Sequence, residues 1–158
     1  MDDQLFETIY NQTARPLWAY VARISGNASA ADDILQETYL RYLRSARRPD
    51  DVKEAKSYLY KIATNLVYDR FRSLNRWSET EVEETQKPTG NSAAVELELT
   101  QVFSRLKEEE RALLWLAYVE GYDHREIARI SNLKKLSVKV LLYRARRKLA
   151  HLMEGEKA

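Results

Sequence analysis

The sequence contains no cysteine, and it has only four glycines and three prolines among its 158 residues. Without cysteine the chain can form neither a disulfide framework nor a zinc site with thiolate ligands. Few segments alternate between apolar and polar residues, as a half-buried strand would. Apolar residues recur instead at helical spacing along most of the chain, which predicts an all-α protein.

The chain also lacks a long apolar segment and a large net charge. No apolar run approaches the roughly 20 residues that a helix needs to cross a bilayer. The N-terminus, MDDQLFETIY, begins acidic and has no signal-peptide pattern, so we expect a cytoplasmic protein without membrane insertion. Because the formal net charge is only +2, any attraction to nucleic acid has to come from local clusters of cations.

Residues that could carry catalysis are sparse. The two histidines, His124 and His151, lie on separate predicted helices with no cysteine nearby. The pair Asp32-Asp33 is better explained as negative charge near the positive end of a helix. The sequence has no glycine-rich phosphate loop. We therefore expect no enzyme, no metal site and no cofactor.

One segment divides the helical pattern in two. Residues 77–94 carry four glutamates against one lysine, together with the turn-forming cluster Pro88-Thr89-Gly90-Asn91-Ser92. We interpret this segment as a flexible acidic linker between a domain at 1–76 and a domain at 95–158. Each part is long enough for a small helical bundle, and we expect the two parts to fold independently.

Start and stop signals place the individual helices. Pro16 suits the first turn of a helix, so it separates a first helix from a second. Ser29 has the character of an N-cap, and Gly121 that of a C-terminal stop. The predicted helices cover residues 3–14, 16–25, 29–46, 54–75, 94–106, 108–120, 123–131 and 135–152.

Basic side chains gather in residues 134–149, which hold seven cations and no acid. At 100° per residue, this helix has an apolar stripe made of Val138, Leu142, Ala145 and Leu149. Its opposite side carries Val140, Tyr143, Arg144 and Arg147, with Lys139 at the flank. A short helix and a break at Asn132 precede it, which is the layout of a helix-turn-helix with its second helix in the DNA major groove. The alternative is a solvated basic face on an ordinary bundle.

An apolar residue, Leu40, stands among charges on the predicted helix 29–46. The side expected to face a core carries Leu35, Tyr39, Tyr42 and Ala46. The opposite side carries Asp33, Glu37, Leu40, Arg41 and Arg44. An apolar anchor within a polar rim is typical of a protein interface. An ordinary exposed leucine is the alternative.

The segment 49–77 mixes cations with aromatic rings. Its expected buried stripe contains Leu59, Ile62 and Leu66, continued by Val67, Phe71 and Leu74. Around this stripe lie Lys53, Lys56, Lys61, Arg70, Arg72 and Arg76, interleaved with Tyr58, Tyr60, Tyr68 and Trp77. Since cations follow a phosphate backbone and rings stack on unpaired bases, the mixture favours single-stranded nucleic acid. For Tyr60 and Tyr68 a core position fits equally well.

Three blocks of the sequence resemble the bacterial sigma-70 family in order and spacing, and within it the small extracytoplasmic-function (ECF) subgroup. The blocks are ADDILQETYLRYL, AKSYLYKIATNLVYDRFR and GYDHREIARISNLKKLSVKVLLYRARRKL. The resemblance implies two helical domains. The first, sigma-2, would bind the clamp of core RNA polymerase and melt the −10 promoter element. The second, sigma-4, would bind the −35 element as duplex and dock on the polymerase flap. It also implies an anti-sigma partner.

The resemblance implies roles for particular residues. Those expected to bind RNA polymerase are Asp33, Gln36, Glu37 and Leu40. Those expected at the −10 element are Lys53, Lys56, Tyr58, Lys61, Asn65, Arg70, Arg72 and Arg76. Those expected at the −35 element are Lys134, Lys135, Ser137, Lys139, Val140, Tyr143, Arg144 and Arg147.

The sequence departs from the family pattern at Lys107 and at the pair Val140-Leu141. Lys107 stands where a proline is common. Val140-Leu141 stands where Ser-Arg is frequent, so the recognition of bases at this step could differ from that of the family.

Two other functions fit the residues. One is a helix-turn-helix regulator that binds an operator without polymerase, and the other is a helical interaction module with a basic surface.

Overall fold

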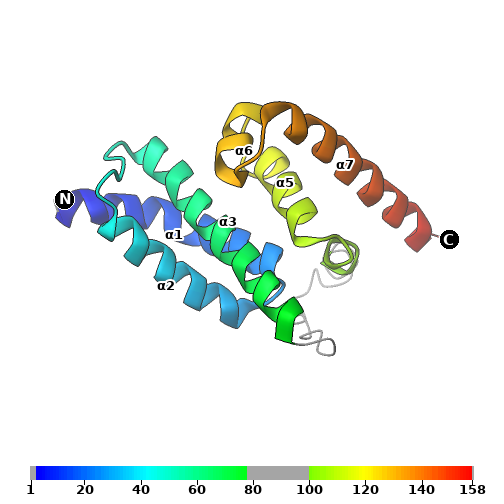
Figure 1. Cartoon of the computed structure of the whole chain (residues 1–158), viewed down its shortest axis with the longest axis horizontal. Helices are drawn as coiled ribbons and strands as arrows, with labels where there is room; N and C mark the ends of the chain where they lie inside the picture. The colour runs from blue at the N-terminus through cyan, green and yellow to red at the C-terminus, as the bar shows by residue number, and fades with distance from the viewer. Residues whose placement is uncertain (1–2, 78–99, 158) are drawn as a thin grey trace.

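The computed structural model describes residues 3–77 and 100–157, and its regular elements in these ranges are α-helices (Figure 1). The first half, residues 3–77, contains α1 (Asp3–Ser25), α2 (Ala28–Arg44) and α3 (Val52–Trp77). The second half, residues 100–157, begins with helical residues 100–104 and continues with α5 (Glu108–Tyr118), α6 (His124–Ser131) and α7 (Lys135–Lys157). The predicted all-α fold class is confirmed.

Most of the predicted linker 77–94 lies outside the described residues, as does the start of the predicted helix 94–106. The domain boundaries at 76 and 95 therefore stay predictions.

One uninterrupted helix replaces the two that were predicted at 3–14 and 16–25. Pro16 lies inside α1, where its ring removes the backbone hydrogen bond that residue 16 would give to Gln12. Thr13, Leu17 and Tyr20 lie on either side of this point and are fully buried. The prediction was wrong because burial on both sides of the proline outweighs the loss of one hydrogen bond.

The ends of α2 also differ from the prediction. Asn27, rather than Ser29, is the N-cap, and its side chain accepts a hydrogen bond of 3.1 Å from the Ala30 N–H. At the other end the backbone is extended at Ser45, and the Arg48 guanidinium donates to the Leu43 carbonyl at 2.8 Å. Ala46, predicted to face the core, is therefore exposed beyond the end of the helix.

Hydroxyl pairs tie the three helices of the first half together inside an apolar core. The Tyr20 hydroxyl lies 2.7 Å from Thr64 Oγ1, joining α1 to α3. The Tyr39 hydroxyl lies 2.5 Å from Thr13 Oγ1, joining α2 to α1. Burial raises the pKa of Tyr39 to about 12, so its phenol stays neutral. These pairs let Tyr20 and Tyr39 fill the core with their hydroxyls satisfied.

In the second half, capping residues set the helix ends. Gly121 has a φ of 74°, and the Tyr122 N–H bonds the Leu116 carbonyl at 2.9 Å, which confirms the predicted stop after α5. Asp123 caps α6 by accepting from the Glu126 N–H at 2.9 Å. These short turns fold α6 and α7 back onto α5.

The two halves pack against each other. Buried residues of α1, α2 and α3 form a single apolar cluster with those of α5, α6 and α7. Arg111, on α5 and nearly buried, donates to the Ile24 carbonyl near the end of α1 from Nη2 at 2.7 Å and from Nε at 3.2 Å. The structure is therefore a closed arrangement of the two halves.

Candidate nucleic-acid interface

The predicted helix-turn-helix is present as α6 and α7. Its turn depends on Asn132, which adopts the left-handed conformation with a φ of 55°. The Leu133 N–H bonds back to the Ala128 carbonyl at 2.9 Å. Asparagine tolerates this conformation better than most residues, so a tight break forms without glycine.

The two sides of α7 differ as the helical periodicity predicts. Val138, Leu142 and Ala145 are buried against the rest of the second half. Val140 and Tyr143 stand on the opposite side, 47% and 51% exposed. Of the eight residues expected at the −35 element, Ser137 is half-buried and the other seven are exposed: Lys134, Lys135, Lys139, Val140, Tyr143, Arg144 and Arg147. These residues form a basic ridge along the exposed side of α7.

Two features of this ridge add to the prediction. Arg147 lies over the Tyr143 ring, with its Cζ 5.9 Å from the centroid, and donates to the Tyr143 hydroxyl at 3.3 Å. Leu136 is 80% exposed and lies beside Val140 and Arg144 around a shallow surface depression. The sequence analysis missed Leu136, because a single leucine on a predicted helix carries no signal of contact by itself.

The cations of α3 do not share a single environment. Lys61, Asn65 and Arg72 fall within about 40° on one side of the helix and are exposed, as is Lys53 in the first turn. Arg72 pairs with Asp69, and Arg70 is half-buried. The Arg76 side chain lies outside the described residues. Lys56 pairs with Glu120 of the second half, with 3.1 Å between Nζ and Oε2.

The aromatic residues of α3 serve mainly the core. Tyr60 is fully buried, with its ring 5.0 Å from that of Tyr20. Tyr58 is half-buried against Tyr42, and its hydroxyl lies 2.8 Å from Ser45 Oγ. For Tyr60 the core alternative is therefore correct, and a base could stack on it only after the side chain left the core.

The residues predicted to bind RNA polymerase lie on an exposed side of α2. Leu40 is 40% exposed, Asp33 and Gln36 are exposed, and Glu37 is half-buried. Glu37 pairs with Arg41 at 3.1 Å within the helix. Leu43, which the sequence analysis did not single out, is also exposed and lies about 60° around the helix from Leu40. The two leucines form an apolar strip bordered by charge.

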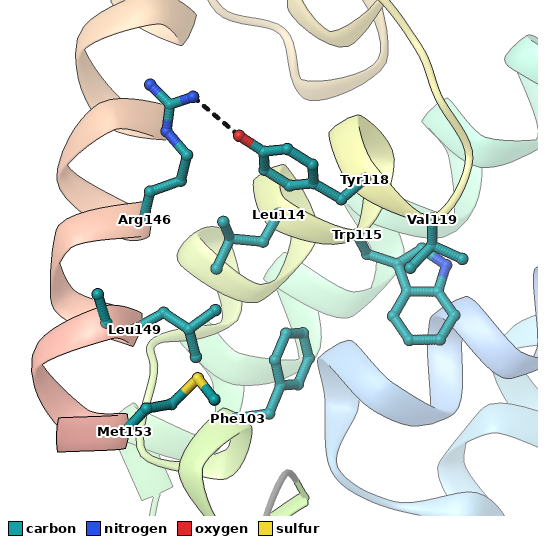
Figure 2. A pocket seen from close by; sticks show the side chains of 9 residues that line it. Phe103, Leu114, Trp115, Tyr118, Val119, Arg146, Leu149 and Met153 are labelled. Carbon is teal, nitrogen blue, oxygen red and sulfur yellow. Dashed lines mark hydrogen bonds between the residues drawn. The ribbon is translucent and has the colours of Figure 1, made fainter. Parts of the chain in front are cut away.

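A further surface, missed from the sequence, is an apolar groove between α7, α5 and residues 100–104 (Figure 2). Figure 2 shows Leu149 and Met153 of α7 converging on Leu114 and Phe103. Arg146 closes one end by donating to the Tyr118 hydroxyl at 2.8 Å. No sequence pattern indicated the groove, because its residues come from three separate segments.

Two kinds of feature are absent from the described residues. Within residues 3–77 and 100–157, no group of His, Cys, Asp or Glu side chains could hold a metal ion. In the same ranges no helix is both long and apolar enough to span a membrane.

Comparison with known proteins gives matches over both halves. The family model for Sigma-70 region 2 matches residues 9–77, and the model for Sigma-70, region 4 matches residues 96–149. The ECF RNA polymerase sigma factor EcfG of Rhodopseudomonas palustris is 30% identical over 87% of this chain and 78% of its own length. SigL of Mycobacterium tuberculosis is 29% identical over 92% and 86%, and SigW of Bacillus subtilis is 28% identical over 94% and 88%.

Among solved structures, a chain of the complex between the sigma factor RpoE and the anti-sigma factor NepR from Bartonella quintana has the same fold. The TM-score is 0.70 at 18% identity, covering 94% of this chain and 96% of that one.

Proposed function

Since this chain belongs to the ECF subgroup of the sigma-70 family, we propose that it binds core RNA polymerase and directs promoter-specific transcription initiation through −10 and −35 elements. The observation that carries the proposal is the exposed basic side of α7 on a helix-turn-helix, within the region 4 match. In this role the protein is no enzyme, and it acts in the cytoplasm, where the polymerase and the promoter are.

The −35 element is read by α7 as duplex DNA. Lys139, Arg144 and Arg147 contact phosphates and fix the register of the helix. Leu136 and Val140 cannot form hydrogen bonds, but they can contact thymine methyl groups in the major groove. The Val140-Leu141 departure from the family pattern thus exchanges polar base readout for apolar contact.

The −10 element is bound as melted DNA along α3. Lys61 and Arg72 lie on one exposed side of the helix with Asn65 between them. The cations follow the phosphates, and the Asn65 amide offers a donor and an acceptor to an unstacked base. Lys53, Lys56, Tyr58, Arg70 and Arg76 complete the expected set, and Lys56 reaches DNA only after it leaves Glu120.

Polymerase is held by two apolar surfaces. The strip of Leu40 and Leu43 on α2 binds the polymerase clamp, with Asp33, Gln36 and Glu37 as its polar rim. The apolar groove of Figure 2 fits the flap docking that the family resemblance implies. An anti-sigma factor would inhibit the protein by covering one of these surfaces.

A binding experiment with a promoter fragment tests the proposal against its rivals. The fragment is presented to the protein with and without core polymerase. We expect specific binding only with polymerase, because two weak half-contacts gain affinity when core fixes both halves at promoter spacing. An operator-binding regulator would bind alone, and an interaction module would bind in neither case.

A further inference from the structure

The first turn of α7 presents a leucine to solvent. Leu136 is 80% exposed, a larger fraction than any other large apolar side chain in residues 3–77 and 100–157. Leu133, just before the helix, packs against the apolar core, whereas Leu136 does not. Leu136 therefore contributes little to the fold, and its whole side chain is available to a partner.

Leu136 and Val140 form one apolar patch on the exposed side of α7. They lie one helical turn apart and border the same shallow depression. Lys139 lies about 100° around the helix from Val140 on one side, and Arg144 lies about 40° from it on the other. An apolar patch with a rim of cations fits a partner that is anionic and also offers apolar groups.

The major groove of DNA has both properties. Its edges are anionic phosphates, and the apolar group that its base edges present is the C5-methyl of thymine. The N-terminal residues of the second helix in a helix-turn-helix face these base edges. Leu136 and Val140 are the second and sixth residues of α7, and the cations Arg144 and Arg147 follow them. The order along the helix thus places apolar groups at the bases and charge at the backbone.

The two apolar side chains face different base pairs. Four residues advance a helix by about 6 Å, whereas successive base pairs are about 3.4 Å apart. Neither leucine nor valine can donate or accept a hydrogen bond, so each can sense a methyl group but not the polar pattern of a base. Thymine and 5-methylcytosine carry the same methyl at the same ring position, and uracil and cytosine lack it.

We infer that Leu136 is a specificity-determining residue that reads the C5-methyl group of a pyrimidine in the −35 element, at a base pair separate from the one that faces Val140. The inference rests on the proposed function and names the chemical group that its −35 site recognises. It has a consequence for regulation. A promoter with cytosine at the position facing Leu136 gains affinity when that cytosine is methylated at C5.

The test begins with a randomised −35 library, from which core polymerase carrying wild-type protein or Leu136→Ala selects bound fragments. The base pair whose selection differs between the two proteins is the one that Leu136 faces. Four promoter fragments are then made that differ only in the pyrimidine of this pair, which is thymine, uracil, cytosine or 5-methylcytosine. The affinity of each polymerase for each fragment is measured, and circular dichroism checks that the variant keeps its helical content.

With wild-type protein we expect thymine to bind about fivefold more tightly than uracil, and 5-methylcytosine about fivefold more tightly than cytosine. Both ratios should approach one with Leu136→Ala. Val140→Ala should leave them unchanged, because Val140 faces another base pair. Lys139→Ala is the control for lost phosphate contact, and it should weaken binding of all four fragments by a similar factor.

The inference is overturned if wild-type protein and Leu136→Ala select the same bases at every position, since Leu136 would then contact a protein or nothing. A wild-type preference for thymine over cytosine without one over uracil would also overturn it, because the group at C4 would then be the one read. Polymerase-dependent binding of wild-type protein to any library member is scored first. Its failure would remove the proposed function, whereas specific binding with both methyl ratios near one would remove only this inference.

Discussion

Leu40 and Val140 are apolar side chains that remain partly in water although apolar cores lie nearby. Leu40 is 40% exposed between charged residues on α2, and Val140 is 47% exposed between cations on α7. Neither fills a core, so substitution at either position should act on binding rather than on folding. A single exposed leucine is common in proteins, so the Leu40 variant needs a control of equal exposure.

For Leu40 we predict that Leu40→Arg weakens binding to core polymerase about tenfold, which corresponds to roughly 1.4 kcal/mol for loss of an apolar anchor. The free energy of unfolding should change by no more than about 0.5 kcal/mol. Glu37→Lys should weaken binding in the same direction by reversing charge in the rim. A pull-down of folded variants with core polymerase measures the effect.

Leu74→Arg is the matched control for Leu40→Arg. Leu74 was predicted to continue the buried stripe of α3, and that prediction was wrong, because Leu74 is 41% exposed. Its exposure is nearly the same as that of Leu40, but it lies on α3 outside the strip. Equal loss of polymerase binding in the two variants would mean that added charge, and not the strip, is responsible.

For Val140 we predict a base preference. A contact with a thymine methyl group contributes about 1 kcal/mol, so one −35 position should prefer thymine over cytosine by roughly fivefold. Val140→Ser should flatten that preference and leave the other −35 positions largely unchanged. Transcription from a randomised −35 library, with polymerase carrying either protein, measures it. If the wild-type protein and Val140→Ser select the same bases at every position, Val140 does not read DNA, and a contact with another protein explains its exposure.

At the scale of the helix, the start of α5 depends on the backbone N–H of Lys107. A proline, which is common at this position in the family, would lack that N–H. The Lys107 N–H donates to Glu110 Oε1 at 2.8 Å, and the Lys148 ammonium of α7 lies 3.0 Å from the same oxygen. Burial alone would raise the pKa of Glu110, but the Lys107 N–H and the Lys148 ammonium outweigh burial and lower it. One carboxylate thus caps α5 and links it to α7.

We predict that Glu110→Gln lowers the free energy of unfolding by about 1 kcal/mol at pH 7. A carboxyl with a lowered folded-state pKa stabilises the fold above its usual value of 4.5, and that stability is lost as the pH falls through the folded-state pKa. The difference from wild type should therefore shrink in acid. Denaturant unfolding at pH 7 and about pH 3 measures it, and Glu109→Gln, which removes charge from the same turn, separates capping from the helix dipole.

The helix ends show which parts of the fold the sequence could predict. Gly121 and the break at Asn132 were predicted correctly because backbone conformation at these positions is a local property. Pro16 was interpreted wrongly because its cost is local, whereas the burial of Leu17 and Tyr20 that outweighs it depends on α2 and α3. Helical periodicity likewise identified the two sides of α7, but it could not reveal a groove built from three segments.

At the scale of the whole molecule, the contact between the halves was not predictable from any pattern. Lys56 and Glu120 lie far apart in the sequence, and each alone is an ordinary surface charge. The acidic segment 77–94 pointed to two independent domains, whereas the closed arrangement adds a specific polar interface between them. Independent folding of each half and a specific interface are compatible if the interface is weaker than either bundle.

A substitution of Arg111 tests whether the interface is weaker than either helical bundle. It binds the Ile24 carbonyl across the interface from two nitrogens, and its guanidinium lies 5.8 Å from the Phe71 ring centroid of α3. Loss of a buried charged donor that leaves its partner unsatisfied costs about 2 kcal/mol or more. Arg111→Met should therefore weaken the association of the halves at least roughly thirtyfold.

The measurement uses a protein in which the recognition site of a specific protease replaces residues 85–91. After cleavage, we expect the two wild-type fragments to elute together from a sizing column and the Arg111→Met fragments to elute apart, each with helical circular dichroism. Arg146→Met is the control, because the Arg146 guanidinium bonds Tyr118 within the second half. Separation of the wild-type fragments would show that the interface is too weak to hold the closed state. Loss of helix in the Arg111→Met fragments would show instead that neither half is stable without the other.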